Sequence, residues 1–241
     1  MKIRNVILLL SLVAFVFVKN SFCRMTSSPD NPSGDESMTV SKILRGMQEA
    51  AENFNRTLEN LQVTQTTTLK STILGDAKIT KLIRFQRPDI IEEKVLEEEK
   101  KVKSGVQMNI DDSVSCVWFI EPLISSLAEE NYHIRLIGQE TINGQPAYVL
   151  KVKPKDKKKS FIKGDFWIDM RDLVPIKYEG KPLKKIDEKS AKGKQIIEYE
   201  KIDDTYWLPI LNRLEASWLL MIKIVNETTF SGYEVNSESS E

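Results

Sequence analysis

The sequence is poor in the side chains on which most enzymes and metal sites depend. Among 241 residues there is one histidine, His133, and there are two cysteines, Cys23 and Cys116. A zinc site needs several His or Cys ligands, and no second histidine or nearby cysteine accompanies His133. The sequence also lacks a phosphate-binding glycine loop and a G-x-S-x-G nucleophile elbow. We therefore predict a protein that is not an enzyme and uses no metal or cofactor.

An excess of charge is also missing. The 35 Lys and Arg residues balance 35 Asp and Glu residues, so we expect no nucleic-acid partner. The charges are nonetheless segregated into an acidic run at 92–99 and lysine-rich loops at 155–159 and 181–185. Two interpretations stay open for these runs. They are solvated hairpin tips and edge-strand protection, or they dock a membrane-protein partner or lipid headgroups.

A long apolar run is absent as well. Lys2 and Arg4 precede an apolar stretch at 6–18, which is shorter than the roughly 20 residues that a spanning helix needs. This pattern predicts a signal peptide over 1–23 and export, to the periplasm in a bacterium. An uncleaved membrane anchor and acylation of Cys23 remain alternatives. If cleavage removes Cys23, Cys116 has no disulfide partner within the chain.

What is present beyond the signal divides the chain into three parts. Residues 24–39 are rich in Pro, Ser, Gly and Asp and predict a flexible linker. We predict one folded domain over 40–235 and a disordered polar tail over 236–241. Within the domain, apolar residues at three- and four-residue spacing from Val40 to Leu61 predict an amphipathic helix.

The region 134–178 predicts an antiparallel sheet, because apolar and polar residues alternate along its short segments. Asn143-Gly144 between two such segments is a strong hairpin signal. A short helix is predicted at 122–131, and 210–225 predicts one long β-like run before a last strand at 228–233. Two interpretations fit the alternation. The inward side chains fill a core, or a curved sheet encloses an apolar cavity for acyl chains or similar ligands.

Four stretches, in this order, resemble the outer-membrane lipoprotein-sorting and carrier family (LolA/LolB-like). FQRPD at 85–89 is similar to the end of a family strand. GQETINGQPAYVL at 138–150 and FWID at 166–169, followed by LVP at 173–175, resemble two family hairpins. DTYWLP at 204–209 resembles the start of a further strand.

The resemblance implies a mainly β (α+β) fold. It would be a half-closed, curved antiparallel sheet with the N-terminal helix and the short helix on its concave face, the latter as part of a lid. It further implies a monomeric periplasmic protein that holds a lipid, or the acyl chains of a lipoprotein, for outer-membrane lipoprotein sorting. An envelope sensor or regulatory interaction module is the alternative. The implied cavity-lining residues are Ile83, Phe85, Tyr148, Leu150, Val152, Phe166, Ile168, Trp207 and Trp218.

Overall fold

A computed structural model describes residues 38–72, 75–87, 90–102, 131–156, 162–182, 191–218 and 222–237. The predicted signal peptide, most of the linker, both cysteines, all but Asn131 of the predicted short helix and most of the lysine-rich loops lie outside these ranges. The described elements are α1 (Val40–Thr57), β1 (Asn60–Ser71), β2 (Gly75–Gln86), β3 (Ile90–Val102), β4 (Tyr132–Ile142), β5 (Gln145–Pro154), β6 (Gly164–Asp169), β7 (Pro175–Gly180), β8 (Ala191–Ile202), β9 (Tyr206–Trp218) and β10 (Ile222–Val235).

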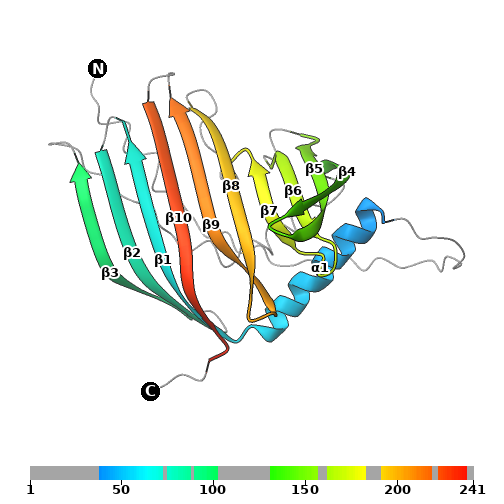
Figure 1. The fold of residues 1–241 in the computed structure, drawn as a ribbon, viewed down its shortest axis with the longest axis horizontal. Coiled ribbons are helices and arrows are strands. Elements are labelled where there is room, and N and C mark those ends of the chain that lie inside the picture. Colours follow the sequence, from blue (N-terminus) through cyan, green and yellow to red (C-terminus); the bar gives the residue numbers. More distant parts are fainter. Residues whose placement is uncertain are drawn as a thin grey trace, which may run out of the picture.

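The strands form one ten-stranded antiparallel sheet in the order β3-β2-β1-β10-β9-β8-β7-β6-β5-β4. Strand β1 pairs with both β2 and β10, so the described strands that come first and last along the chain lie side by side within the sheet. The sheet curves without closing, and helix α1 runs obliquely from its lower end towards β4 (Figure 1). This arrangement confirms the predicted mainly β, half-open sheet with an N-terminal helix.

Helix α1 begins at a side-chain cap and buries one face. The Thr39 hydroxyl accepts a hydrogen bond from the backbone N–H of Lys42 at 3.3 Å. Ile43, Met47 and Ala51, spaced four residues apart, are its buried residues. The helix ends at Thr57, earlier than predicted, because the three-residue spacing that leads to Leu61 belongs to the alternating pattern of β1.

One reversal of the chain confirms a predicted hairpin, and another contradicts a predicted strand. Asn143 and Gly144 adopt positive φ of 51° and 82°, which confirms the hairpin between β4 and β5. The single run over 210–225 is wrong. Trp218 ends β9 and lies opposite Ile222 of β10 in an antiparallel pair. Residues 219–221 are Leu, Leu and Met, so no turn-forming residue marks this reversal in the sequence.

The junction between α1 and β1 is held by Asn236, which was predicted to open the disordered tail. Its side-chain oxygen accepts hydrogen bonds from the backbone N–H groups of Glu59 at 2.8 Å and Asn60 at 3.2 Å. Its amide nitrogen donates to the Thr57 carbonyl at 2.8 Å and to the Tyr206 hydroxyl at 2.9 Å. The C-terminal end of the helix is therefore tied to the sheet.

Candidate functional site on the concave face

The face of the sheet under helix α1 is apolar and closely packed. Leu150 and Val152 of β5 and Phe166 and Ile168 of β6 are all 0% exposed. We call the cluster they form with the helix the helix-covered core; its buried members are Ile43, Met47, Ala51, Tyr132, Ala147, Leu150, Val152, Ile162, Phe166, Ile168, Val174, Ile176, Tyr178, Ile197, Tyr199 and Trp207. The rings of Phe166 and Tyr178 lie 4.7 Å apart.

The structure brings most of the predicted cavity-lining residues together. Those that belong to the helix-covered core are Leu150, Val152, Phe166, Ile168 and Trp207. Tyr148 is partly buried and packs against the same core. In these described strands the inward side chains pack against helix α1, which lies on the concave face as predicted.

Three predicted lining residues lie elsewhere. Ile83 packs with Val63 and Phe230 in a separate cluster. Phe85 belongs to a third cluster, with Leu58, Leu61 and Leu208 at the end of the helix. Trp218 is the last residue of β9, and its side chain lies outside the described part of the chain.

Helix α1 approaches the turn between β6 and β7 closely at a glycine. A Cβ atom at Gly46 would lie 2.2 Å from Cδ1 of Leu173, so a larger residue there would push the helix or the turn away. Asp169 shapes this turn, because its Oδ1 accepts hydrogen bonds from the backbone N–H groups of Arg171 at 2.8 Å and Asp172 at 2.7 Å. The stretch 167–175 therefore forms the turn against which helix α1 packs.

Asp172 provides a polar anchor at the rim of the helix-covered core. Its Oδ2 accepts hydrogen bonds from Lys201 Nζ at 2.6 Å and from the Trp207 indole N–H at 2.8 Å. Partial burial of the carboxyl acts to raise its pKa, but the hydrogen bonds from Lys201, Trp207 and Arg171 hold the pKa below its ordinary value. Nothing in the sequence pattern singles out Asp172, which was read as part of a hairpin.

The face formed by β1 and β10 is polar in its middle. Gln65, Thr67 and Thr228 are buried there, and we call them the polar row. Gln65 Nε2 donates to the Thr67 hydroxyl at 3.2 Å, and the Thr67 and Thr228 hydroxyls lie 3.1 Å apart. The sequence shows this region as a Thr-rich strand, and its burial becomes evident only from the pairing of β1 with β10.

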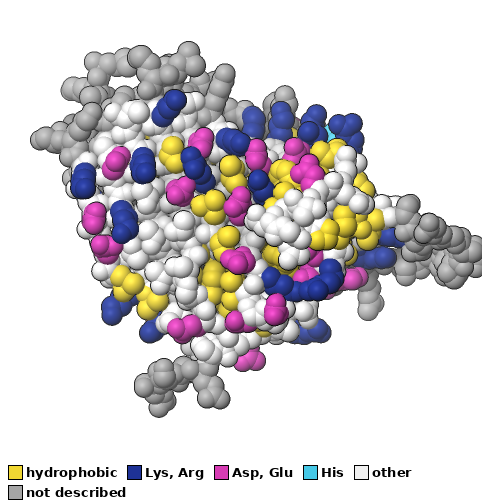
Figure 2. Space-filling view, viewed as in Figure 1, with side chains coloured by type: hydrophobic (Ala, Val, Ile, Leu, Met, Phe, Trp, Pro, Cys, Tyr) yellow, Lys and Arg dark blue, Asp and Glu magenta, His cyan; other side chains and the backbone are white. Residues whose placement is uncertain are grey.

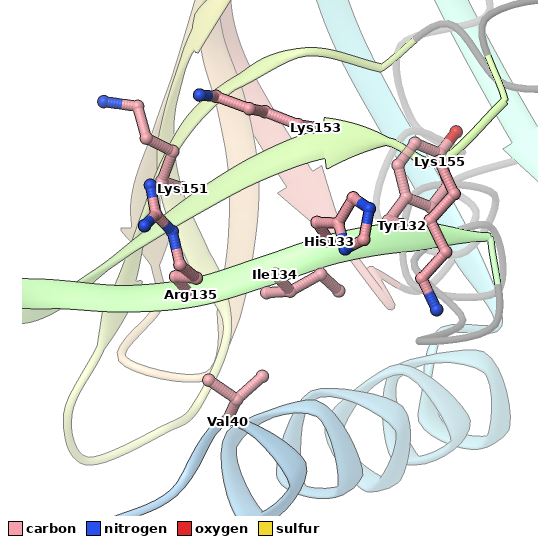
Figure 3. A pocket seen from close by; sticks show the side chains of 8 residues that line it. All are labelled: Val40, Tyr132, His133, Ile134, Arg135, Lys151, Lys153 and Lys155. Atoms are coloured by element: carbon pink, nitrogen blue, oxygen red, sulfur yellow. The ribbon is translucent and has the colours of Figure 1, made fainter.

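A groove of about 580 Å³ lies at the β4 edge of the sheet. Its lining, which we call the basic groove, is Val40, Tyr132, His133, Ile134, Arg135, Lys151, Lys153 and Lys155. Arg135, Lys151 and Lys153 point to the same side of the β4–β5 hairpin, whereas Ile134 lies towards Val40 of the helix (Figure 3). The sequence held a partial signal for this site, since Lys151 and Lys153 occupy alternating positions in β5.

The described ranges hold no group of three or more His, Cys, Asp or Glu side chains placed to bind a metal ion. Helix α1, the helix that these ranges contain, is not long and apolar enough to cross a membrane.

Comparisons with known proteins give a likeness of fold. A family model described as an uncharacterized protein matches residues 123–218, and no curated protein matches the chain. Among solved structures, a Vibrio parahaemolyticus domain assigned to outer membrane lipoprotein sorting is 17% identical, with a TM-score of 0.40, over 84% of this chain and 96% of that one. A LolA superfamily protein from Nitrosomonas europaea is 14% identical over the same shares, also at 0.40. The lipoprotein LppX of Mycobacterium tuberculosis is 9% identical, with a TM-score of 0.28, over 84% of this chain and all of that one.

Proposed function

We propose that this protein is an exported, non-enzymatic binding protein of the bacterial envelope that holds lipid or lipoprotein acyl chains in the helix-covered core. Helix α1 closes the apolar face of the sheet with its buried side chains Ile43, Met47 and Ala51. The covering of this apolar face by helix α1 is the observation that supports the proposal best. An apolar face covered by one movable element can accept an apolar ligand when that element is displaced.

The energetics favour such an exchange. Burying a chain of about 16 methylenes contributes on the order of 12 kcal/mol, at roughly 0.8 kcal/mol per CH₂. Exposing Ile43 and Met47 costs about 1.5–3 kcal/mol for each side chain. For an acyl chain taken from water, this gain exceeds the cost of exposing Ile43 and Met47. The remainder must also offset exposure of Ala51 and the partly buried helix residues, and the entropy lost on binding.

The two ends of the helix are held differently, and this defines how it would open. The C-terminal end is fixed by Asn236 and by Arg87, whose Nε donates to the Leu58 carbonyl at 2.6 Å. The N-terminal end carries the Thr39 cap and continues into the predicted flexible linker. We expect the helix to pivot near Leu58 and to leave the sheet first at Val40.

The order of the motifs over 85–209 supports the finer role of outer-membrane lipoprotein sorting. Periplasmic localisation, a monomeric state and a membrane-protein partner at the lysine-rich loops also remain predictions. An envelope sensor would need the same fold to bind a protein partner in place of a lipid.

A disulfide that locks the helix tests the proposal. A Cβ at Gly46 would lie 3.2 Å from that of Leu173, so Gly46→Cys with Leu173→Cys, in a Cys116→Ser background, can form a bridge after a small shift. The protein is purified without detergent and offered palmitoyl lysophospholipids, and bound lipid is measured by native mass spectrometry. We expect uptake in the reduced form and none in the oxidised form.

The Cys116→Ser protein alone is the control, and its uptake should not depend on oxidation. If this control arrives empty and takes up no lipid, the lipid-binding function is wrong. Equal uptake by the oxidised and reduced forms would instead show that the chain binds away from the helix.

A further inference from the structure

The basic groove concentrates positive charge that its own surroundings leave largely uncompensated. Lys151 Nζ forms an ion pair with Asp165 Oδ1 at 3.6 Å, a distance that is too long for a hydrogen bond. Arg135, Lys153 and Lys155 form no ion pair with other residues of the described ranges. Figure 2 shows dark blue Lys and Arg side chains gathered around the one histidine of the chain.

The register of strands β4 and β5 places positive charges opposite each other, which lowers the stability of the folded protein. Arg135 lies directly opposite Lys151, and both side chains carry a positive charge. Like charges at directly opposed positions of an antiparallel pair destabilise a sheet. A bound anion would remove this repulsion, so the groove has the properties of an anion site.

The groove also shares a wall with the helix-covered core. Tyr132 is 5% exposed and belongs to that core, and Ile134 and Val40 pack against it. All three residues line the groove. Strand β4 is one edge of the sheet formed by the described strands, so its cationic side and its apolar side meet there without another described strand beyond them.

We infer that the basic groove is a headgroup site that selects lipids with an anionic phosphate headgroup, while their acyl chain enters the helix-covered core past Val40 and Ile134. This inference rests on the proposed lipid-binding function and specifies its ligand. Val40 opens helix α1, so the entrance lies at the end of the helix that we expect to lift first.

Two lysolipids with the same palmitoyl chain test the inference. Lysophosphatidylglycerol carries a net negative charge, and lysophosphatidylcholine carries none. We expect the wild-type protein to bind the anionic lipid about tenfold more tightly in titration calorimetry below the micelle concentration, and higher salt should reduce the difference. Arg135→Gln with Lys153→Gln should abolish most of this preference and leave the affinity for the zwitterionic lipid unchanged.

A matched control removes two cations at the opposite edge of the same sheet. Lys94→Gln with Lys101→Gln changes exposed residues of β3 and should leave the preference intact. The groove variant should melt no lower than the wild type, because it removes like-charge repulsion. A lower melting temperature together with an unchanged preference would assign these cations a structural role and overturn the inference.

The other outcomes separate the two proposals. Equal affinity of the wild type for both lipids overturns the headgroup site and leaves lipid binding in place. Binding of neither lipid removes the proposed function and the inference together. If glycerol phosphate, which has no chain, binds as tightly as the anionic lysolipid, the groove takes a soluble phosphate compound and the lipid headgroup is wrong.

Discussion

The two halves of the concave face are buried alike but differ in chemistry. In the helix-covered half, alternating residues of β5 and β6 such as Leu150 and Phe166 are apolar and fully buried. In the half formed by β1 and β10, the buried positions alternate just as strictly, yet Gln65, Thr67 and Thr228 occupy several of them. Alternation therefore reports which face of a strand is buried, and it does not report what that face can bind.

This difference indicates where a lipid would lie. Buried hydroxyl and amide groups need hydrogen-bond partners, and the Gln65 amide nitrogen and the Thr67 and Thr228 hydroxyls have partners within the polar row. An acyl chain laid against it would gain little and would disturb those bonds. The helix-covered half is lined mainly by aliphatic and aromatic side chains, and the hydroxyl of Tyr178 donates to the Lys181 carbonyl. Under the proposed function, the ligand should therefore replace helix α1 there.

The largest loss of stability is expected when an aromatic residue of the helix-covered core is truncated. Phe166→Ala removes a ring that packs against Tyr178 and should lower the free energy of unfolding by about 3–5 kcal/mol. Urea denaturation measures this loss. Ile137→Ala, at a position 49% exposed on β4, is the control and should stay within about 0.5 kcal/mol of the wild type. A cost for Phe166→Ala near that of the control would mean that the helix-covered core is loosely packed.

The polar row should respond in a different way, through coupled hydrogen bonds. Thr67→Val leaves the Thr228 hydroxyl and the Gln65 amide each without one partner and should cost about 1–3 kcal/mol. Thr228→Val should behave similarly, and the double variant should cost less than the sum of the two. A double-mutant cycle from urea denaturation measures this coupling. Strict additivity would show that the two hydroxyls do not interact.

The smallest loss of stability is expected at Asp172, at the rim of the helix-covered core. Asp172→Asn weakens the charged hydrogen bonds to Lys201 and Trp207 and should cost about 1–2 kcal/mol at neutral pH. Because the folded-state pKa of Asp172 lies below its ordinary value of 3.8, its contribution is present above that pH and is lost as the pH falls through the folded-state pKa.

The stability difference between wild type and Asp172→Asn should therefore shrink in acid below about pH 4. Denaturation curves at a series of pH values measure this change. Asp204→Asn, at an exposed turn position with φ of 52°, is the control and should show little loss at any pH. A difference that grows in acid would contradict the assignment of a lowered pKa to Asp172.

The sequence predicted the parts of the site that depend on local pattern. Alternation predicted an antiparallel sheet over 134–178, and Asn143-Gly144 set one of its hairpins. The family resemblance then assigned Leu150 and Phe166 to one apolar surface. The position of the helix could not be predicted in this way, because it depends on the contact between Gly46 and Leu173, which are distant in the chain. For the same reason Ile83 and Phe85 were assigned to one cavity, although they belong to separate clusters.

The basic groove could not be predicted without knowing how strands β4 and β5 pair. The pattern placed Lys151 and Lys153 on the outward face of their strand, but the partners across from them depend on the register of β4. That register shifts at a bulge between Leu136 and Gly138, which the sequence does not reveal. Outward-facing charge could be predicted from the sequence, whereas its convergence with Arg135 at an open edge could not.

The hydrogen bonds of Asn236 set an order on how the chain can mature. Helix α1 gains the Asn236 part of its C-terminal anchor only when this residue, far along the chain, reaches Thr57 and Glu59. A ribosome or an export channel delivers Asn236 long after it delivers the helix. Until then the C-terminal end of α1 is held to the sheet by Arg87 and by its packed face. The attachment of the helix to the sheet is therefore completed only after nearly all of the described domain has emerged.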